Sequence, residues 1–139
     1  MKVAIIIINF NGEEDTIQCL QSLEILNFPK ENLLTVVVDN GSKKKFELPK
    51  AKLNGGNIKV LNTGENLGFA GGNNFGIRYA IENEADYIML LNNDTYVEKN
   101  LVKELLTAFQ SESNVGIIAP KIYFAKGFEF HKNNYREND

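Results

Sequence analysis

Two carboxylates follow mostly apolar segments that have the composition of buried strands. Asp39 comes directly after residues 33–38, and Asp94 follows residues 87–91 and two asparagines. Short apolar runs bounded by polar residues are typical of strands that are covered on both faces in a parallel sheet. Because open α/β sheets bind ligands at the carboxyl ends of their strands, both carboxylates are predicted to lie at one ligand-binding edge.

The run Asn92-Asn93-Asp94 places one carboxylate behind two amides. That arrangement suits a single hard cation that also binds the oxygens of a phosphorylated ligand. At the equivalent position of another strand, Asp39 is placed to meet the base or the sugar of such a ligand. An ordinary turn is the alternative, because Asn, Asp and Thr are frequent turn residues. The residue types alone leave both interpretations open.

A glycine-rich segment precedes the strand that ends in Asp94. Four glycines occur within the nine residues 68–76, and a helical pattern with Ile77, Ala80 and Ile81 on one face follows. Glycine permits positive φ and close approach of a ligand to the backbone, whereas the alternative is a flexible turn with a helix cap. The segment lacks the Gly-Lys-Ser/Thr sequence that ends a P-loop, and it lacks the G-x-G-x-x-G spacing of a dinucleotide-binding fingerprint.

The segments that position these residues alternate between strand and helix patterns. Strands are predicted at 3–8, 33–38, 58–61, 87–91 and, interrupted by Pro120, at 115–124. Helices are predicted from about residue 13 to Leu26, after the glycine-rich segment, and over 98–109, with an irregular connection at 43–57. This alternation predicts one α/β domain with a mainly parallel sheet.

Composition excludes several classes of protein. The chain has 139 residues, 43% of them hydrophobic, and a formal charge of −3, which provides no electrostatic footprint for nucleic acid. A single cysteine, Cys19, excludes an internal disulfide and fits a reducing compartment. No segment has the ~18 to 20 apolar residues of a transmembrane helix. We therefore expect a soluble, cytoplasmic protein, with peripheral membrane association left open.

The predicted first helix begins with three acids, Glu13, Glu14 and Asp15. They complement the positive end of the helix dipole but would repel a phosphate there. A nicotinamide-dependent oxidoreductase uses that helix start, with a glycine fingerprint, to bind pyrophosphate. The acids and the missing fingerprint disfavour that class.

Four polar motifs occur in order along this pattern, at 9–12 (NFNG), 38–42 (VDNGS), 66–74 (NLGFAGGNN) and 91–94 (LNND). Together they resemble family 2 glycosyltransferases, most closely the rhamnosyltransferase-like branch. The resemblance spans about residues 1–124 as a nucleotide-sugar-binding domain, and 125–139 are expected to form a polar, loosely ordered tail. It implies a GT-A fold, a Rossmann-like three-layer α/β sandwich with a mainly parallel sheet, truncated relative to the family domain.

The resemblance also implies a function in polysaccharide biosynthesis. The donor would be a nucleotide-diphosphate sugar bound with Mg²⁺ or Mn²⁺, and the sugar would pass to a glycan, lipid or protein acceptor with inversion. Asp39 matches the residue that hydrogen-bonds the base, and Asp94 matches the metal ligand. The implied donor-binding residues are Asn9, Asn11, Asp39, Asn66, Gly68, Gly71, Gly72, Asn73, Asn74, Asn92 and Asn93.

Two departures from the family pattern shape the prediction. Asn92 replaces the first carboxylate of the metal motif, so metal binding without nucleotide is predicted to be weak. The family's catalytic base lies in the second half of its domain, and neither Glu129 nor Glu137 lies in a matching motif. We assign no catalytic residue. A noncatalytic nucleotide-sugar-binding or assembly module is therefore the alternative, and a homodimer or partner chain at an exposed sheet edge is a further hypothesis.

Overall fold

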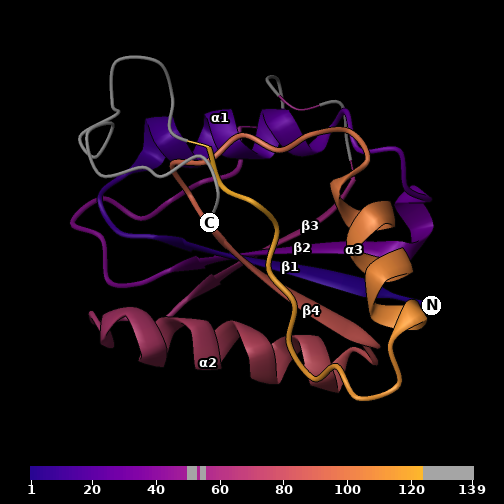
Figure 1. Cartoon of the computed structure of the whole chain (residues 1–139). Helices are drawn as coiled ribbons and strands as arrows, with labels where there is room; N and C mark the ends of the chain where they lie inside the picture. The colour runs from indigo at the N-terminus through magenta and orange to yellow at the C-terminus, as the bar shows by residue number, and fades with distance from the viewer. Residues whose placement is uncertain (50–52, 54–55, 124–139) are drawn as a thin grey trace, which may run out of the picture.

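The computed structural model describes residues 1–49, 53 and 56–123 (Figure 1). The predictions for residue 124 and for the tail at 125–139 lie outside the described residues.

Among the described residues, four parallel strands form a sheet in the order β3-β2-β1-β4. Their bounds are Val3–Asn9 for β1, Leu33–Asp39 for β2, Asn57–Asn62 for β3 and Tyr87–Asn92 for β4. The register places the polar carboxyl ends side by side, with Asn9 opposite Asp39, Asp39 opposite Asn62 and Ile8 opposite Asn92. The mainly parallel sheet predicted from the apolar runs is confirmed.

Helices cover both faces of this sheet. Helix α1 (Glu13–Leu23) lies on one face and α2 (Gly68–Glu82) on the other, while α3 (Leu101–Ser111) lies near the N-terminus (Figure 1). Alternate residues of β1 enter the two halves of the core: Ile5 packs with the α1 side and Ile6 with the α2 side. Both side chains are fully buried, because β1 lies between β2 and β4.

Helix α2 packs closely on the sheet at Gly76. A Cβ atom on Gly76 would stand 2.6 Å from Ile6 Cγ2 and 3.0 Å from Val38 Cγ2, so a larger residue would push the helix outward. The prediction that the glycines precede the helix is wrong, since α2 already begins at Gly68. Ile81, predicted to share one helix face with Ile77 and Ala80, is 61% exposed, whereas Ala80 is fully buried, because the face that contacts the sheet is formed by the smaller residues of the helix.

The last predicted segments differ from the structure. Strand β4 was expected to be buried on both faces, but Leu90 is 50% exposed, because in the described part of the sheet β4 has a neighbour on one side only. The strand predicted from residue 115 is wrong for the described positions 115–123, which are irregular, with Ile117 92% exposed. An apolar pattern without a neighbouring strand does not form sheet.

Within the described ranges, each helix lacks the length or apolarity for crossing a membrane.

Candidate functional site

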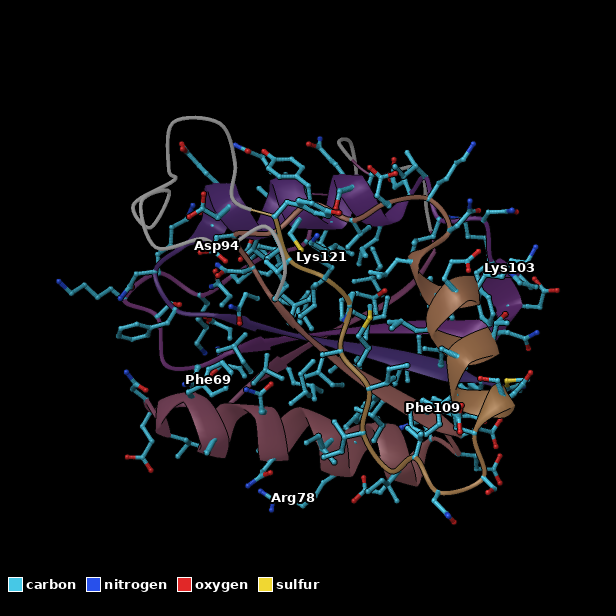
Figure 2. The ribbon with its side chains drawn as sticks, viewed as in Figure 1. Phe69, Arg78, Asp94, Lys103, Phe109 and Lys121 are labelled. Carbon is cyan, nitrogen blue, oxygen red and sulfur yellow. The ribbon has the colours of Figure 1, made fainter. Side chains whose placement is uncertain are left out.

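The carboxyl edge of the sheet brings the predicted polar motifs together. Asn9, Asp39 and Asn62 end three adjacent strands, and Asn92 ends β4 on the other side of β1. Figure 2 shows Asp94 at this end of the sheet, on the side of α1, and Phe69 at the same end but on the other face, at the start of α2. The predicted common edge for Asp39 and Asp94 is therefore present.

Asp39 is fully buried, and its carboxylate accepts four hydrogen bonds. One oxygen accepts from Asn9 Nδ2 at 3.0 Å and from the Ser42 hydroxyl. The other accepts from the backbone N–H of Phe46 at 3.1 Å and from Asn62 Nδ2 at 3.2 Å. A buried charge needs such a set of donors, so this carboxylate ties β1, β3 and the loop after β2 together.

Asn9 extends these contacts toward α1 and β4. Its Nδ2 atom also reaches Ser42 Oγ at 3.1 Å, and its Oδ1 atom accepts from the Thr16 hydroxyl at 2.8 Å. The Thr16 oxygen in turn accepts from Asn93 Nδ2 at 3.0 Å. Among the described residues, every buried side-chain nitrogen and oxygen atom has a partner, so the network is complete.

The loop after β1 presents Phe10 and Asn11 to solvent. Asn11 has a positive φ of 54°, and its backbone N–H donates to Ser42 Oγ at 2.9 Å. Its Oδ1 atom accepts from the backbone N–H of Lys43 at 2.9 Å, while Phe10 is 48% exposed. Two hydrogen bonds thus hold Asn11 in an exposed position beside the loop after β2.

The turn after β4 contains residues that face in opposite directions. Asn92 and Asp94 are exposed, whereas the Asn93 amide points inward to Thr16. Thr95 Oγ1 donates to the Asn92 carbonyl at 2.6 Å, which closes the turn. Asn93 and Asp94 therefore form a turn, as the alternative interpretation held, and this turn presents the Asp94 carboxylate at the carboxyl edge of the sheet.

Cys19 of α1 lies beneath this turn, with its Sγ atom 3.7 Å from the Asn92 carbonyl oxygen. Burial raises the pKa of the thiol to about 11, an effect that hydrogen bonding to Thr95 reduces and the charge of Asp94 increases. The thiol is therefore protonated at neutral pH and serves as a packing group and weak donor.

The donor set at Asp94 suits a cation that is shared with a ligand. The described residues contain no group of three or more His, Cys, Asp or Glu side chains that could hold a metal ion. In the described part of the chain, Asp94 is therefore not a member of a cluster of three such ligands. Mg²⁺ commonly binds through one or two carboxylates together with substrate phosphates and water, so the site fits a cation that arrives with a diphosphate.

The glycine-rich segment divides into exposed and inward-facing residues. Asn66 is exposed, and its Oδ1 atom accepts from the Gly68 N–H at 2.8 Å and from Asn40 Nδ2 at 3.2 Å. Gly68, with φ of 71°, and Asn74 are also exposed. Of the remaining predicted residues, Gly72 is buried against Asn40, and Asn73 is buried and donates to the Phe69 carbonyl at 3.0 Å, whereas Gly71 is only half-buried.

Four residues whose side chains hydrogen-bond at this edge are not among the predicted site residues: Thr16, Ser42 and Asn62 in the network, and Asn40 beside the glycine-rich segment. Thr16 shares a helical stripe with Leu20 and Leu23, at spacings of four and seven residues. A polar residue in an apolar stripe needs a buried partner, and this was the available signal.

Comparison with known proteins identifies the family. The sequence model described as glycosyl transferase family 2 matches residues 4–138. The chain is 32% identical over 127 residues to the low-salt glycan biosynthesis hexosyltransferase Agl10 of Haloferax volcanii, covering 90% of this chain and 38% of that protein. It is 27% identical over 115 residues to the dTDP-rhamnosyl transferase RfbF of Shigella flexneri, covering 83% and 36%.

Solved structures of glycosyltransferases also superpose on this chain. TarS 1–349 of Staphylococcus aureus in complex with UDP-GlcNAc superposes with a TM-score of 0.66 at 28% identity, covering 80% of this chain and 32% of that one. The mannosyltransferase PcManGT of Pyrobaculum calidifontis superposes with a TM-score of 0.64 at 18% identity, a likeness of fold alone. The chain spans about a third of the length of these relatives. The predicted resemblance and GT-A fold are confirmed, and the chain belongs to glycosyl transferase family 2.

Proposed function

We propose that this chain binds a nucleotide-diphosphate sugar together with Mg²⁺ or Mn²⁺, as the donor-binding part of an inverting glycosyltransferase of polysaccharide biosynthesis. One observation carries the proposal. At the carboxyl edge, a complete buried network fixes the loops after β1, β2 and β4, while Asn11, Asn92 and Asp94 remain exposed. A rigid base under exposed polar groups is the arrangement expected of a preformed ligand site.

The diphosphate belongs on the Asp94 side of this edge. The leaving group of the reaction is a nucleoside diphosphate, and a bound divalent cation would neutralise the negative charge that develops on it. Asp94 would hold that cation, and its exposure leaves the remaining coordination positions to phosphate oxygens and water. The acidic start of α1, where Glu13 pairs with Lys44 at 3.0 Å, disfavours phosphate binding on that helix.

The nucleoside belongs on the side of β2. Contact between Asp39 and the base stays a prediction, and it would require the carboxylate to exchange one of its four donors for the ligand. Asn11 and Phe10 are exposed in the adjacent loop and are available without such an exchange. A relative that was solved with UDP-GlcNAc supports a nucleotide sugar as ligand.

Calorimetric titration with UDP, GDP and dTDP, each with Mn²⁺ and with EDTA, tests the proposal. At least one nucleoside diphosphate should bind, and Asp94→Ala should abolish the increase in affinity that Mn²⁺ causes. Asp86→Ala is the matched control, because Asp86 is also exposed but precedes β4 at the opposite end of the strand. Absence of binding under all conditions would contradict the proposal, as would Mn²⁺-dependent affinity that survives Asp94→Ala.

A noncatalytic nucleotide-sugar-binding module is the second candidate, since no catalytic base is assigned. Donor hydrolysis and transfer with Mn²⁺ separate the two candidates: turnover supports the enzyme, and binding without turnover across a broad acceptor screen supports the module. The same assays should identify the nucleotide base and the sugar of the donor, and the acceptor. A cytoplasmic location and dimerisation stay predictions, to be checked by cell fractionation and light scattering.

A further inference from the structure

The turn after β4 contacts the start of α1 through a side chain that was predicted to bind the donor. The Asn93 amide nitrogen donates to Thr16 Oγ1 at 3.0 Å and approaches the Gly12 carbonyl oxygen at 3.4 Å. Asn93 is partly buried, whereas Asn92 and Asp94 on either side are exposed. The Asn93 amide is thus engaged by the protein, and the two flanking side chains remain available to a ligand.

Thr16 links this turn to the rest of the edge. Its side chain is fully buried, and its one hydroxyl hydrogen faces Asn9 Oδ1 and the Gly12 carbonyl oxygen, both at 2.8 Å. Asn9 in turn donates to Asp39 at 3.0 Å. A continuous series of hydrogen bonds therefore runs from the residue beside Asp94 to the carboxylate at the end of β2.

Gly12 provides an independent observation about the same contact. A Cβ atom there would stand 2.8 Å from Asn93 Nδ2, although the backbone φ of −121° is open to any residue. Glycine at this position therefore makes room for the Asn93 amide. Any larger residue would displace that amide while leaving the Thr16 hydroxyl intact.

We propose that Thr16 is a positioning residue, which acts through Asn93 and Asn9 to fix Asp94 relative to the loops at the ends of β1 and β2. This inference rests on the proposed function, in which the cation and the nucleoside bind at these two places. The separation between them is then set by the protein before the ligand binds. Side chains that hydrogen-bond a metal ligand typically change metal affinity ~10- to 100-fold when they are replaced, and we expect Thr16, which bonds the residue beside Asp94, to act within that range.

The test compares Thr16→Val with Thr16→Ser and with Thr35→Val. Valine has the shape of threonine but cannot accept from Asn93 or donate to Asn9, whereas serine keeps the hydroxyl. Thr35→Val makes the same chemical change at another buried threonine, in the interior of β2 four residues before Asp39. Titration with the nucleoside diphosphate that binds best is repeated with Mn²⁺ and with EDTA.

Thr16→Val should lower the Mn²⁺-dependent affinity about 10- to 100-fold while leaving the affinity in EDTA within about twofold. Thr16→Ser should restore the wild-type value, and Thr35→Val should retain it. Gly12→Ala should reproduce the selective loss, which keeps the test decisive if Thr16→Val fails to fold. In NMR spectra of the ligand-free protein, the side-chain amide hydrogens of Asn93 should exchange slowly with water in the wild type and fast in Thr16→Val.

Equal Mn²⁺-dependent affinities of folded Thr16→Val and wild type would overturn this inference, as would an equal loss in Thr35→Val. A uniform loss with and without Mn²⁺ would also overturn it, because that outcome indicates a structural role only. If the wild type binds no nucleoside diphosphate, the proposed function itself fails. The exchange of the Asn93 amide then still reports whether the Thr16 contact exists.

Discussion

Asp39 and Asp94 lie at the same edge of the sheet but in opposite environments. Asp39 ends a strand that has β1 on one side and β3 on the other, so it is fully buried and accepts four hydrogen bonds. Asp94 follows β4, which has one neighbour in the described sheet, and it is exposed. The comparison teaches that the place of a strand in the sheet decides whether the carboxylate at its end is buried or exposed.

The largest expected effect comes from removing the buried carboxylate. Asp39→Ala should lower the free energy of unfolding by at least about 3 kcal/mol, because it leaves the amides of Asn9 and Asn62 and the N–H of Phe46 without their acceptor. Urea denaturation measures this loss. Asp39→Asn should cost less, since it keeps one acceptor oxygen. A stability within about 1 kcal/mol of wild type would break the comparison between the two aspartates.

A smaller effect is expected where α2 approaches the sheet. Gly76→Ala should lower the free energy of unfolding by about 1–2 kcal/mol, because overpacking against Ile6 and Val38 outweighs the gain in helix propensity. Gly116→Ala is the matched control, since a Cβ atom there has no neighbour within 4 Å. Equal thermal stabilities of the two variants would contradict the close packing of α2 on the face of the sheet.

Cys19, beneath the Asp94 turn, should make stability depend on pH. The folded protein keeps the thiol proton up to a pKa of about 11, whereas the unfolded chain loses it near the ordinary value of 9.0. Stability should therefore fall as the pH rises from about 9 to 11, by on the order of 2 kcal/mol. Cys19→Ala should remove this part of the pH dependence in chemical denaturation. Rapid labelling of the native thiol at pH 8 would show that the turn does not bury it.

The smallest effect on stability is expected at the exposed carboxylate. Asp94→Ala should change the free energy of unfolding by less than about 0.5 kcal/mol, because the side chain is exposed at a turn. The same variant is the one expected to lose Mn²⁺-dependent nucleotide affinity. Thermal denaturation checks the first expectation. A large destabilisation would mean that Asp94, like Asp39, has a structural role.

Most of the fold was predictable because the strands carry strong local signals. The β-branched runs at 3–8 and 33–38 identified the two central strands, whose ends were extended only by the polar residues Asn9 and Asp39. Helix α2 was harder, because glycine disfavours helix locally while packing against the sheet outweighs that preference. The strand expected from residue 115 failed for the opposite reason: its pattern is favourable, but the described positions have no neighbouring strand.

The location of the candidate site could be predicted from the sequence, but the hydrogen bonds within it could not. The strand ends located Asp39, Asn92 and Asp94 at one edge, because the register of a parallel sheet follows from its apolar runs. The inward direction of Asn93 was not predictable, since its partner Thr16 lies 77 positions away and is set by how α1 packs. Only long-range packing decides which of the three adjacent polar residues turns inward and which two stay exposed.

The position of β4 in the sheet also has a consequence for the order of folding. Lys2 and Asp86, next to the paired ends of β1 and β4, are 84 positions apart, whereas Asn9 and Asp39 of the β1–β2 pair are 30 apart. Closing the longer loop costs about 1 kcal/mol more in chain entropy, so β4 should dock after the β1–β2 pair has formed. Pulsed hydrogen exchange during refolding should find protection in β1 and β2 before β4, and simultaneous protection would contradict this order. Asp94 would then reach its place only in the final stage of folding.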